Sequence, residues 1–219
     1  YVPGDDLRMI DWNIYGRLER LFLKLFLEEE DLHVYILVDT SASMRFGKPS
    51  KLFFAKKVAA ALGYIALANL DRLVVGTFTE GTPTMLRSLR GKHSAMRLLD
   101  FLVRAVPGGA TDAESSLRGF AVTHRAKGIA ILISDLLDKR GHEPALRYLL
   151  AGAHDVFVVQ VLSPEELSPE LGGDLTLVDA EDEDETEVTV SAPLLRAYKN
   201  TLNSFVASVK DYCTRRGMT

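Results

Sequence analysis

The chain has 219 residues, of which 47% are hydrophobic, which is enough for one domain with a sizeable core or for a domain with an appendage. Its 26 basic and 30 acidic side chains give a net charge of −4, which argues against a nucleic-acid-binding surface, because such a surface needs a basic stripe. The single cysteine, Cys213, excludes an intrachain disulfide and a thiolate zinc cluster.

An N-terminal flanking segment is expected over residues 1–30, ahead of a main domain over residues 31–219. The flank carries the turn sequence PGDD at residues 3–6 and then the only tryptophan, Trp12. Two interpretations stay open. In one, Ile10 and Trp12 bury against the core while arginines and aspartates of the segment pair with one another. In the other, the segment is a docking surface for a partner.

Four short apolar segments rich in valine or isoleucine are typical of strands buried on both faces. In chain order they are Val34–Val38, Leu73–Phe78, Ile129–Ile133 and Val156–Leu162. Helical patterns lie between and after them, over Lys51 to about Asn69 with Ser50 as N-cap, Ser94–Val106, Asp112 to about Ala126, and His142–Ala153. Strands that alternate with helices predict an α/β fold, a three-layer αβα sandwich around a mostly parallel sheet.

Further elements are expected at the edge of this sheet and after it. Met85–Leu89 lies between two glycines close behind the second strand, so we expect one antiparallel edge strand. Leu175–Asp179 and Glu187–Val190 can pair as a hairpin whose tip is the acidic run Glu181–Glu185, which is typical of a solvated loop. Ala192–Arg216 predicts a long amphipathic helix that packs against the sheet or the hairpin.

The sequence offers no membrane-spanning segment. Its longest dense apolar stretch, Val58–Leu70, is shorter than the roughly 20 residues that a spanning helix needs. Because the chain begins at Tyr1 rather than at methionine, we expect it to be a piece of a longer protein, and a cytoplasmic location is an expectation for this piece alone.

Oxygen-bearing side chains follow two of the predicted strands. Asp39, Ser41 and Ser43 come directly after the first strand, and Asp135 ends the strand over Ile129–Ile133. Ligands of an open parallel sheet bind at the carboxyl ends of its strands, so these side chains are expected at one edge. The Gly-Gly loop before Thr111 would present a third hydroxyl there. Carboxylate and hydroxyl oxygens are hard ligands that suit Mg²⁺.

A local interpretation of the same residues stays open. Serine and aspartate favour turns and helix caps because their side chains bond to the nearby backbone. Ser41 and Ser43 would then only shape a turn, and Asp112 would cap the helix that follows Thr111.

The pattern as a whole resembles the metal-ion-dependent adhesion site of von Willebrand factor type A domains. It comprises DxSxS at residues 39–43, a threonine after a Gly-Gly loop, and a later strand-end aspartate. The resemblance implies that Ser41, Ser43 and Thr111 bind Mg²⁺ or Mn²⁺ directly while Asp39 and Asp135 act largely through water. It also implies an open coordination position for an Asp or Glu carboxylate of a partner protein, and coupling of that binding to movement of the last helix.

The start of the chain carries a second resemblance. YVPGDDLRMIDW at residues 1–12, followed by Arg17, is similar to the segment that precedes the adhesion-like domain in the domain of unknown function 58 family. Since both blocks occur in the right order, the whole chain resembles a member. This implies a bacterial or archaeal protein that partners a MoxR-type AAA+ ATPase, and an interaction module rather than an enzyme.

Two alternatives to an interaction module remain. A phosphotransfer enzyme of the haloacid dehalogenase type also uses Mg²⁺ and a strand-end aspartate, but it needs a second carboxylate two residues later, where this chain has Ser41. A structural module that keeps the fold with an idle site is the other. A serine hydrolase and a P-loop are not indicated, because GxSxG and the Walker pattern are absent from the sequence.

Overall fold

The structure is a computed structural model that describes residues 10–22, 32–152, 154–179 and 184–219. The chain divides into two compact units, residues 1–31 and residues 32–219. In the first unit, helix α1 (Trp12–Leu18) begins at Asp11, whose carboxylate accepts the N–H groups of Asn13 and Ile14 at 3.0 and 3.2 Å. The PGDD turn predicted at residues 3–6 lies outside the described residues.

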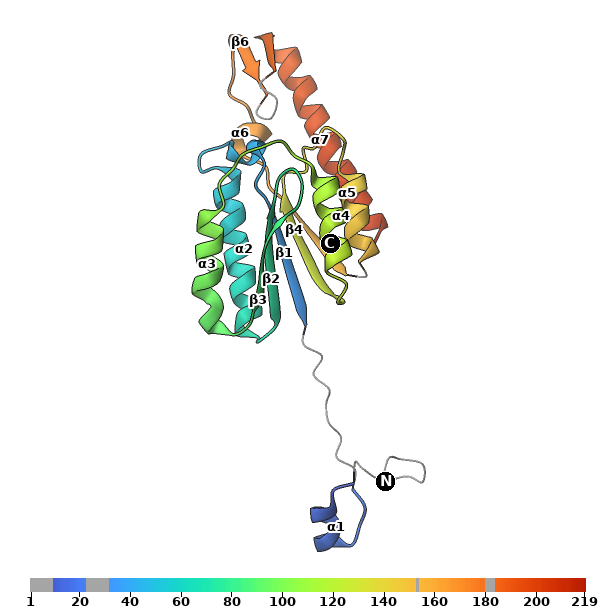
Figure 1. The fold of residues 1–219 in the computed structure, drawn as a ribbon. Coiled ribbons are helices and arrows are strands. Elements are labelled where there is room, and N and C mark those ends of the chain that lie inside the picture. Colours follow the sequence, from blue (N-terminus) through green and yellow to red (C-terminus); the bar gives the residue numbers. More distant parts are fainter. Residues whose placement is uncertain (1–9, 23–31, 153, 180–183) are drawn as a thin grey trace. The chain divides into compact units, whose positions relative to one another are not determined.

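The second unit is built on a five-stranded sheet of order β3-β2-β1-β4-β5 (Figure 1). The strands are β1 (His33–Asp39), β2 (Arg72–Phe78), β3 (Thr84–Leu89), β4 (Gly128–Ser134) and β5 (Asp155–Gln160). Four of them run parallel, and β3 pairs antiparallel with β2 at one edge. The predicted parallel sheet with one antiparallel edge strand is therefore confirmed.

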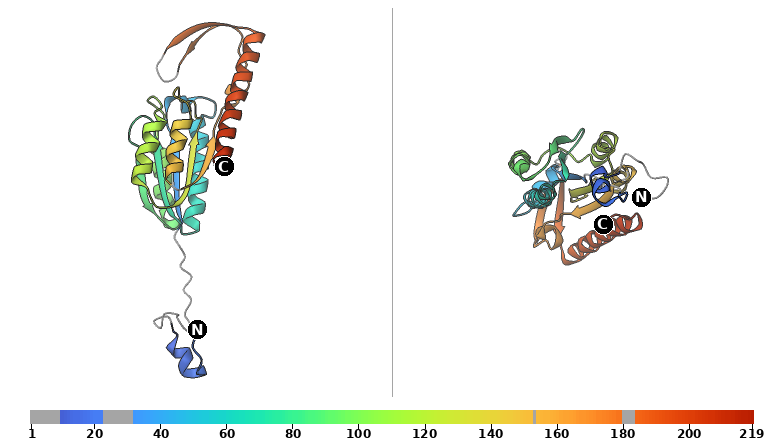
Figure 2. Two further views of the ribbon diagram at one scale, coloured as in Figure 1. Left: turned by 90° about the vertical axis from the view of Figure 1, so that its right-hand side faces the viewer. Right: turned by 90° about the horizontal axis from the view of Figure 1, so that it is seen from below.

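Helices cover both faces of the sheet, which confirms the three-layer sandwich (Figures 1 and 2). On one face lie α2 (Lys51–Ala68) and α3 (Ala95–Arg104), and on the other α4 (Ala113–Thr123), α5 (Glu143–Ala151) and α7 (Ala192–Arg215). Short helical turns join these elements: η2 (Ala42–Arg45), η3 (Lys92–Ser94) and α6 (Pro164–Leu167). Asp112 caps α4, as the sequence predicts, by accepting the Ser115 N–H at 2.9 Å.

Two hydrophobic cores lie on the two faces of the sheet. Alternate residues of β1 point to opposite faces, so Val34 and Ile36 pack with α2 and α3, whereas Tyr35 and Leu37 pack with α4, α5 and α7. Every one of these four side chains is buried. A central strand that is apolar on both faces explains why its sequence shows a continuous hydrophobic run rather than an alternation.

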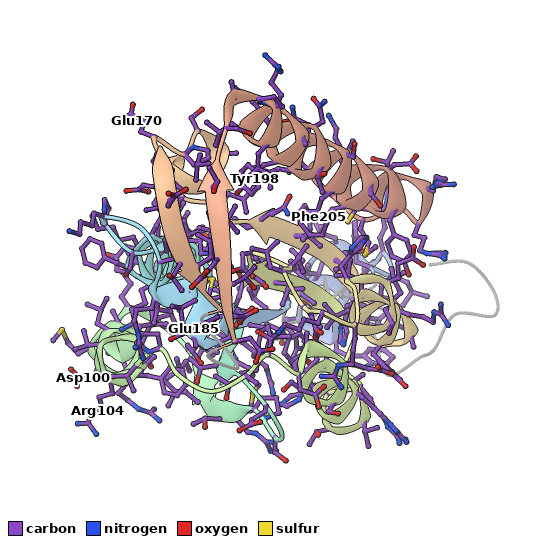
Figure 3. All side chains as sticks on the ribbon, turned by 90° about the horizontal axis from the view of Figure 1, so that it is seen from above. Asp100, Arg104, Glu170, Glu185, Tyr198 and Phe205 are labelled. Atoms are coloured by element: carbon purple, nitrogen blue, oxygen red, sulfur yellow. The ribbon has the colours of Figure 1, made fainter. Side chains whose placement is uncertain are left out.

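A second sheet of two strands, β6 (Gly173–Val178) and β7 (Glu185–Val190), precedes α7. It arches above the carboxyl ends of the main-sheet strands (Figures 2 and 3). Both strands are largely exposed, and near the tip Asp179 pairs with Lys139 at 3.1 Å. Of the predicted acidic tip Glu181–Glu185, residues 181–183 lie outside the described part of the chain, and Glu185 is the first residue of β7 rather than part of the tip. No helix of the described residues is long and apolar enough to cross a bilayer.

Candidate metal centre

The strand order places a topological switch between β1 and β4. From β1 the chain moves outward to β2 and β3 on one side, and from β4 it moves outward to β5 on the other. Loops that leave the carboxyl ends of two such strands diverge and leave room for a ligand. Asp39 is the last residue of β1, and Asp135 directly follows β4, so both aspartates lie at this point.

The Asp39 carboxylate shapes the loop that follows β1. It is fully buried, and its Oδ1 accepts the Ser41 N–H at 2.9 Å. Its Oδ2 accepts the hydroxyl of Ser134 at 2.6 Å. The backbone turns sharply here because the carboxylate replaces a main-chain acceptor. The turn brings the next two serines back toward β4.

A chain of hydroxyls joins the two strand ends. The Ser43 hydroxyl donates to Asp135 Oδ2 at 2.8 Å, and Ser41 Oγ lies 3.0 Å from Ser43 Oγ. A hydroxyl has one proton to donate, so with that of Ser43 used on Asp135, the Ser41 hydroxyl donates to Ser43. Four of the five residues predicted from the sequence are therefore brought together: Asp39, Ser41, Ser43 and Asp135.

Thr111 is placed beside the same edge by its backbone. The loop before it is hydrogen-bonded to residues 40–43, which follow β1 and are called the serine loop here. Gly108 N–H donates to Thr40 O and Ala42 N–H donates to Gly109 O, both at 3.0 Å. The Thr111 carbonyl accepts from Arg140 Nη2 at 3.3 Å. Gly109 has φ of +77°, a conformation that favours glycine, which explains the need for this residue in the loop.

The two aspartates differ in their electrostatic surroundings. Burial, together with the nearby charge of Asp135, raises the pKa of Asp39 to about 6, although the bonds from Ser134 and Ser41 oppose this shift. Asp135 instead receives an ammonium, because Lys51 Nζ lies 2.7 Å from its Oδ2. A buried carboxylate without a cation of its own is a group that a divalent ion would stabilise.

Three residues of the centre escaped the sequence prediction. They are Ser134, Lys51 and Glu166, whose Oε1 lies 2.5 Å from Lys51 Nζ. Burial alone would lower the pKa of the Lys51 ammonium, but the two carboxylates raise it above its usual value, so the side chain is charged. The sequence held one signal for it: a lysine in the first turn of a helix opposes the helix dipole, and a nearby anion removes that conflict.

The donor set fits Mg²⁺ better than zinc. In the described ranges, no group of three or more His, Cys, Asp or Glu side chains is arranged to hold a metal ion. The oxygens brought together are the carboxylates of Asp39 and Asp135 and the hydroxyls of Ser41 and Ser43. Mg²⁺ accepts so few protein ligands because it retains several of its waters. Zinc prefers nitrogen and sulfur donors.

An open cavity of about 640 Å³ adjoins the serine loop. It is lined by Ala42, Arg45, Phe46, Gly47, Lys48 and Glu165. The Phe46 side chain is half exposed there, and Arg45 donates to the Pro107 carbonyl at 3.2 Å. The hollow thus combines the exposed Phe46 ring with two basic side chains and one acidic side chain, Glu165.

Comparison with known proteins gives a family without an assigned activity. Residues 1–204 match the family model described as "Protein of unknown function DUF58". An uncharacterized protein of Mycobacterium tuberculosis is 28% identical over 186 residues, which are 83% of this chain and 58% of that protein. An uncharacterized protein of Mycobacterium avium is 29% identical over 114 residues, or 51% of this chain and 67% of that protein.

A solved structure shares the fold. The crystal structure of an aerotolerance-related membrane protein from Bacteroides fragilis superposes with a TM-score of 0.51 at 16% identity, over 77% of this chain and 87% of that one. At such low identity the likeness concerns the fold alone. This chain spans about 58% of the length of the Mycobacterium tuberculosis relative, so the described fold is part of what such a protein contains.

Proposed function

We propose that this chain, which belongs to the DUF58 family of proteins of unknown function, is a Mg²⁺-dependent protein interaction module. In this proposal Ser41, Ser43 and Thr111 bind the ion directly, as in a von Willebrand factor type A adhesion site, and Asp39 and Asp135 act through its waters. An open coordination position then accepts an Asp or Glu carboxylate of a partner protein. The module performs no reaction of its own.

The observation that carries the proposal is the row of hydrogen bonds from Ser41 through Ser43 to Asp135 at the switch point, called the serine chain below. Ser41 Oγ, Ser43 Oγ and Asp135 Oδ2 are linked at 3.0 and 2.8 Å, so oxygens from two separate strand ends converge. A turn that only needed capping would not require its hydroxyls to reach a carboxylate 92 residues away in the sequence. This convergence favours an ion site over the local interpretation.

The cavity beside the serine loop supports a partner of acidic character. Its lining carries two basic side chains, Arg45 and Lys48, against one acidic side chain, Glu165, and a carboxylate that completes the metal would come from a segment lying across this hollow. A MoxR-type AAA+ ATPase is the partner implied by the family resemblance. We propose such an ATPase as the first candidate, with a surface Asp or Glu as the group that reaches the ion.

The geometry weighs against a phosphotransfer enzyme. An aspartate nucleophile must present one oxygen to a phosphorus atom, but Asp39 is fully buried and both of its oxygens accept hydrogen bonds. The residue two positions later is Ser41, whose hydroxyl cannot act as the acid or base that this chemistry needs. An idle site remains the rival against which the proposal is tested.

Calorimetric titration with Mg²⁺ and with Mn²⁺ tests the proposal. Wild type should bind either ion at one site, and Asp39→Asn and Ser43→Ala should weaken binding by about tenfold or more, since each removes an interaction with the hydrated ion. Asp100→Asn is the matched control, because Asp100 is an exposed carboxylate on α3 (Figure 3). Equal heats in all four proteins, or no heat in wild type, would refute metal binding.

The partner is tested separately with purified components. A MoxR-type ATPase from the same genome should bind the wild-type chain in Mg²⁺, and binding should be lost with chelator and with Asp39→Asn. Binding that survives chelation would place the contact elsewhere on the surface and would contradict a metal-bridged carboxylate.

A further inference from the structure

Lys51 is a buried cation in the first turn of α2. The helix begins at Ser50, whose hydroxyl accepts the Phe53 N–H at 3.3 Å, and Lys51 is the next residue, only 2% exposed. Lysine is almost never fully buried unless it is paired. The positive end of the helix dipole also disfavours it at this position. Burial and the helix dipole both raise the free energy of the Lys51 ammonium, so we expect strong anionic partners beside it.

The partner of Lys51 in the centre is the oxygen on which the serine chain ends. Lys51 Nζ lies 2.7 Å from Asp135 Oδ2, and the same oxygen accepts the Ser43 hydroxyl at 2.8 Å. The Lys51 and Asp135 side chains are each 1% exposed, so water hardly screens their attraction. A positive charge therefore already sits against one of the two carboxylates that a divalent ion would use.

We infer that Lys51 is a built-in competitor of the divalent ion, which holds the Asp135 carboxylate in the metal-free protein and must yield Asp135 Oδ2 when Mg²⁺ binds. The inference rests on the proposed function and concerns the regulation of the same site. It assigns Lys51 a role opposite to that of a ligand: the ammonium lowers the affinity of the centre for metal.

Glu166 makes the exchange possible. Its Oε1 lies 2.5 Å from Lys51 Nζ, so an ammonium that leaves Asp135 keeps a second carboxylate as partner. Its Oε2 accepts the Ser163 N–H at 2.7 Å in the capping box of α6, which fixes the position of the glutamate. Stripping a buried ammonium of every partner would be prohibitive, but passing it from two carboxylates to one is a smaller cost.

The competition has a consequence for partner binding. A centre whose own lysine opposes the ion binds Mg²⁺ weakly by itself, and a carboxylate from a partner adds the negative charge that offsets the ammonium. Metal and partner then bind more tightly together than either does alone, and the coupling acts equally in both directions.

A charge-balanced double variant tests the inference. Lys51→Met with Glu166→Gln removes one positive and one negative charge, so the net charge stays the same, and the glutamine oxygen can still accept the Ser163 N–H. Calorimetry should show Mg²⁺ binding at least about tenfold tighter than in wild type. Lys57→Met is the control on the same helix, because Lys57 is exposed, and its affinity should equal that of wild type.

The outcomes separate this inference from the proposed function. Binding by wild type with equal or weaker binding by the double variant overturns the competitor and leaves the metal site intact, since Lys51 would then only support Asp135. If the double variant binds Mg²⁺ and the wild type does not, the role of Lys51 as a competitor is supported. No binding by either protein overturns both proposals.

A measurement on the unaltered protein covers the case in which the double variant does not fold. The side-chain NMR resonances of Lys51 should shift as Mg²⁺ saturates the centre, because the ammonium loses one of its two carboxylates. Those of Lys57 should stay in place. Lys51 resonances that do not move at saturating Mg²⁺ overturn the inference.

Discussion

At the scale of single residues, Asp39 and Asp135 differ in the groups that stabilise their negative charge. Asp135 is neutralised by Lys51, whereas Asp39 relies on the Ser41 N–H and the Ser134 hydroxyl. Burial and the charge of Asp135 therefore raise the pKa of Asp39 to about 6. The folded metal-free protein binds this proton more tightly than the unfolded chain does. Asp39 thus favours folding at low pH, and that contribution is lost as pH rises from about 4 to about 6.

Metal binding should reverse this pH dependence. Mg²⁺ is attracted by the ionised carboxylate, so we expect saturating Mg²⁺ to raise the melting temperature by several degrees at about pH 7.5 and by little at about pH 5. Thermal melts with Mg²⁺ and with chelator at the two pH values measure the difference. Asp39→Asn should make the remaining shift independent of pH in this range. A wild-type shift of equal size at both pH values would show that Asp39 is not part of the ion site.

At the scale of elements, the central strands β1 and β4 were predictable because each contains a continuous run of five apolar residues. The run Val34–Val38 lies within β1, and Ile129–Ile133 lies within β4. Ends were less predictable, since they depend on tertiary contacts. The fourth strand was predicted to reach Leu162, but β5 ends at Gln160, and the next N–H, that of Val161, donates to the Ser134 carbonyl.

The candidate site was predictable only where its residues lie at strand ends. A carboxylate after a buried strand reveals itself in the sequence, and topology then brings Asp39 and Asp135 together. Lys51 and Glu166 gave local signals of another kind, a helix start and a capping box beginning at Ser163. Nothing in those signals says that the two helix starts meet, because Lys51 and Glu166 are 115 residues apart. That contact is a product of how α2 and α6 pack.

The two halves of α7 are held differently. Toward its C-terminus, Val209 and Cys213 are buried in the core, and the Tyr212 hydroxyl donates to the Glu143 carbonyl at 3.1 Å. In its first half, Leu194 and Tyr198 are about 40% exposed, at 41% and 40%. The Tyr198 hydroxyl donates to the Glu166 carbonyl at 2.9 Å, which joins α7 to α6 (Figure 3).

Hydrogen exchange should follow this division. Few apolar contacts allow local opening at low free energy, so amides of residues 195–201 should exchange at least about tenfold faster than those of residues 206–213. Exchange followed by mass spectrometry on peptides of α7 measures both segments in one experiment. Tyr198→Phe removes the bond to α6 and should speed exchange in the first segment only. Equal protection along the helix would contradict the uneven anchoring.

At the scale of the whole molecule, the two hydrophobic cores join segments from both ends of the second unit. The described members of these cores run from Val34 to Met218. Two main-chain hydrogen bonds also join residue 219 to β5, since Thr219 N–H donates to Val156 O and Val158 N–H donates to Thr219 O. The last residue of the chain is thereby held against β5.

Because the described members of both cores belong to the second unit, we expect that removing residues 1–31 leaves folding and metal binding intact. We expect a chain of residues 32–219 to melt within a few degrees of the full chain, because the loss of a segment outside the cores changes stability little. It should also bind Mg²⁺ with the same affinity. Circular dichroism melts and calorimetry of the two chains measure both quantities. A large fall in melting temperature would favour the interpretation in which Ile10 and Trp12 pack on the main domain. Unchanged folding with lost binding of the ATPase would instead identify the N-terminal segment as a docking surface.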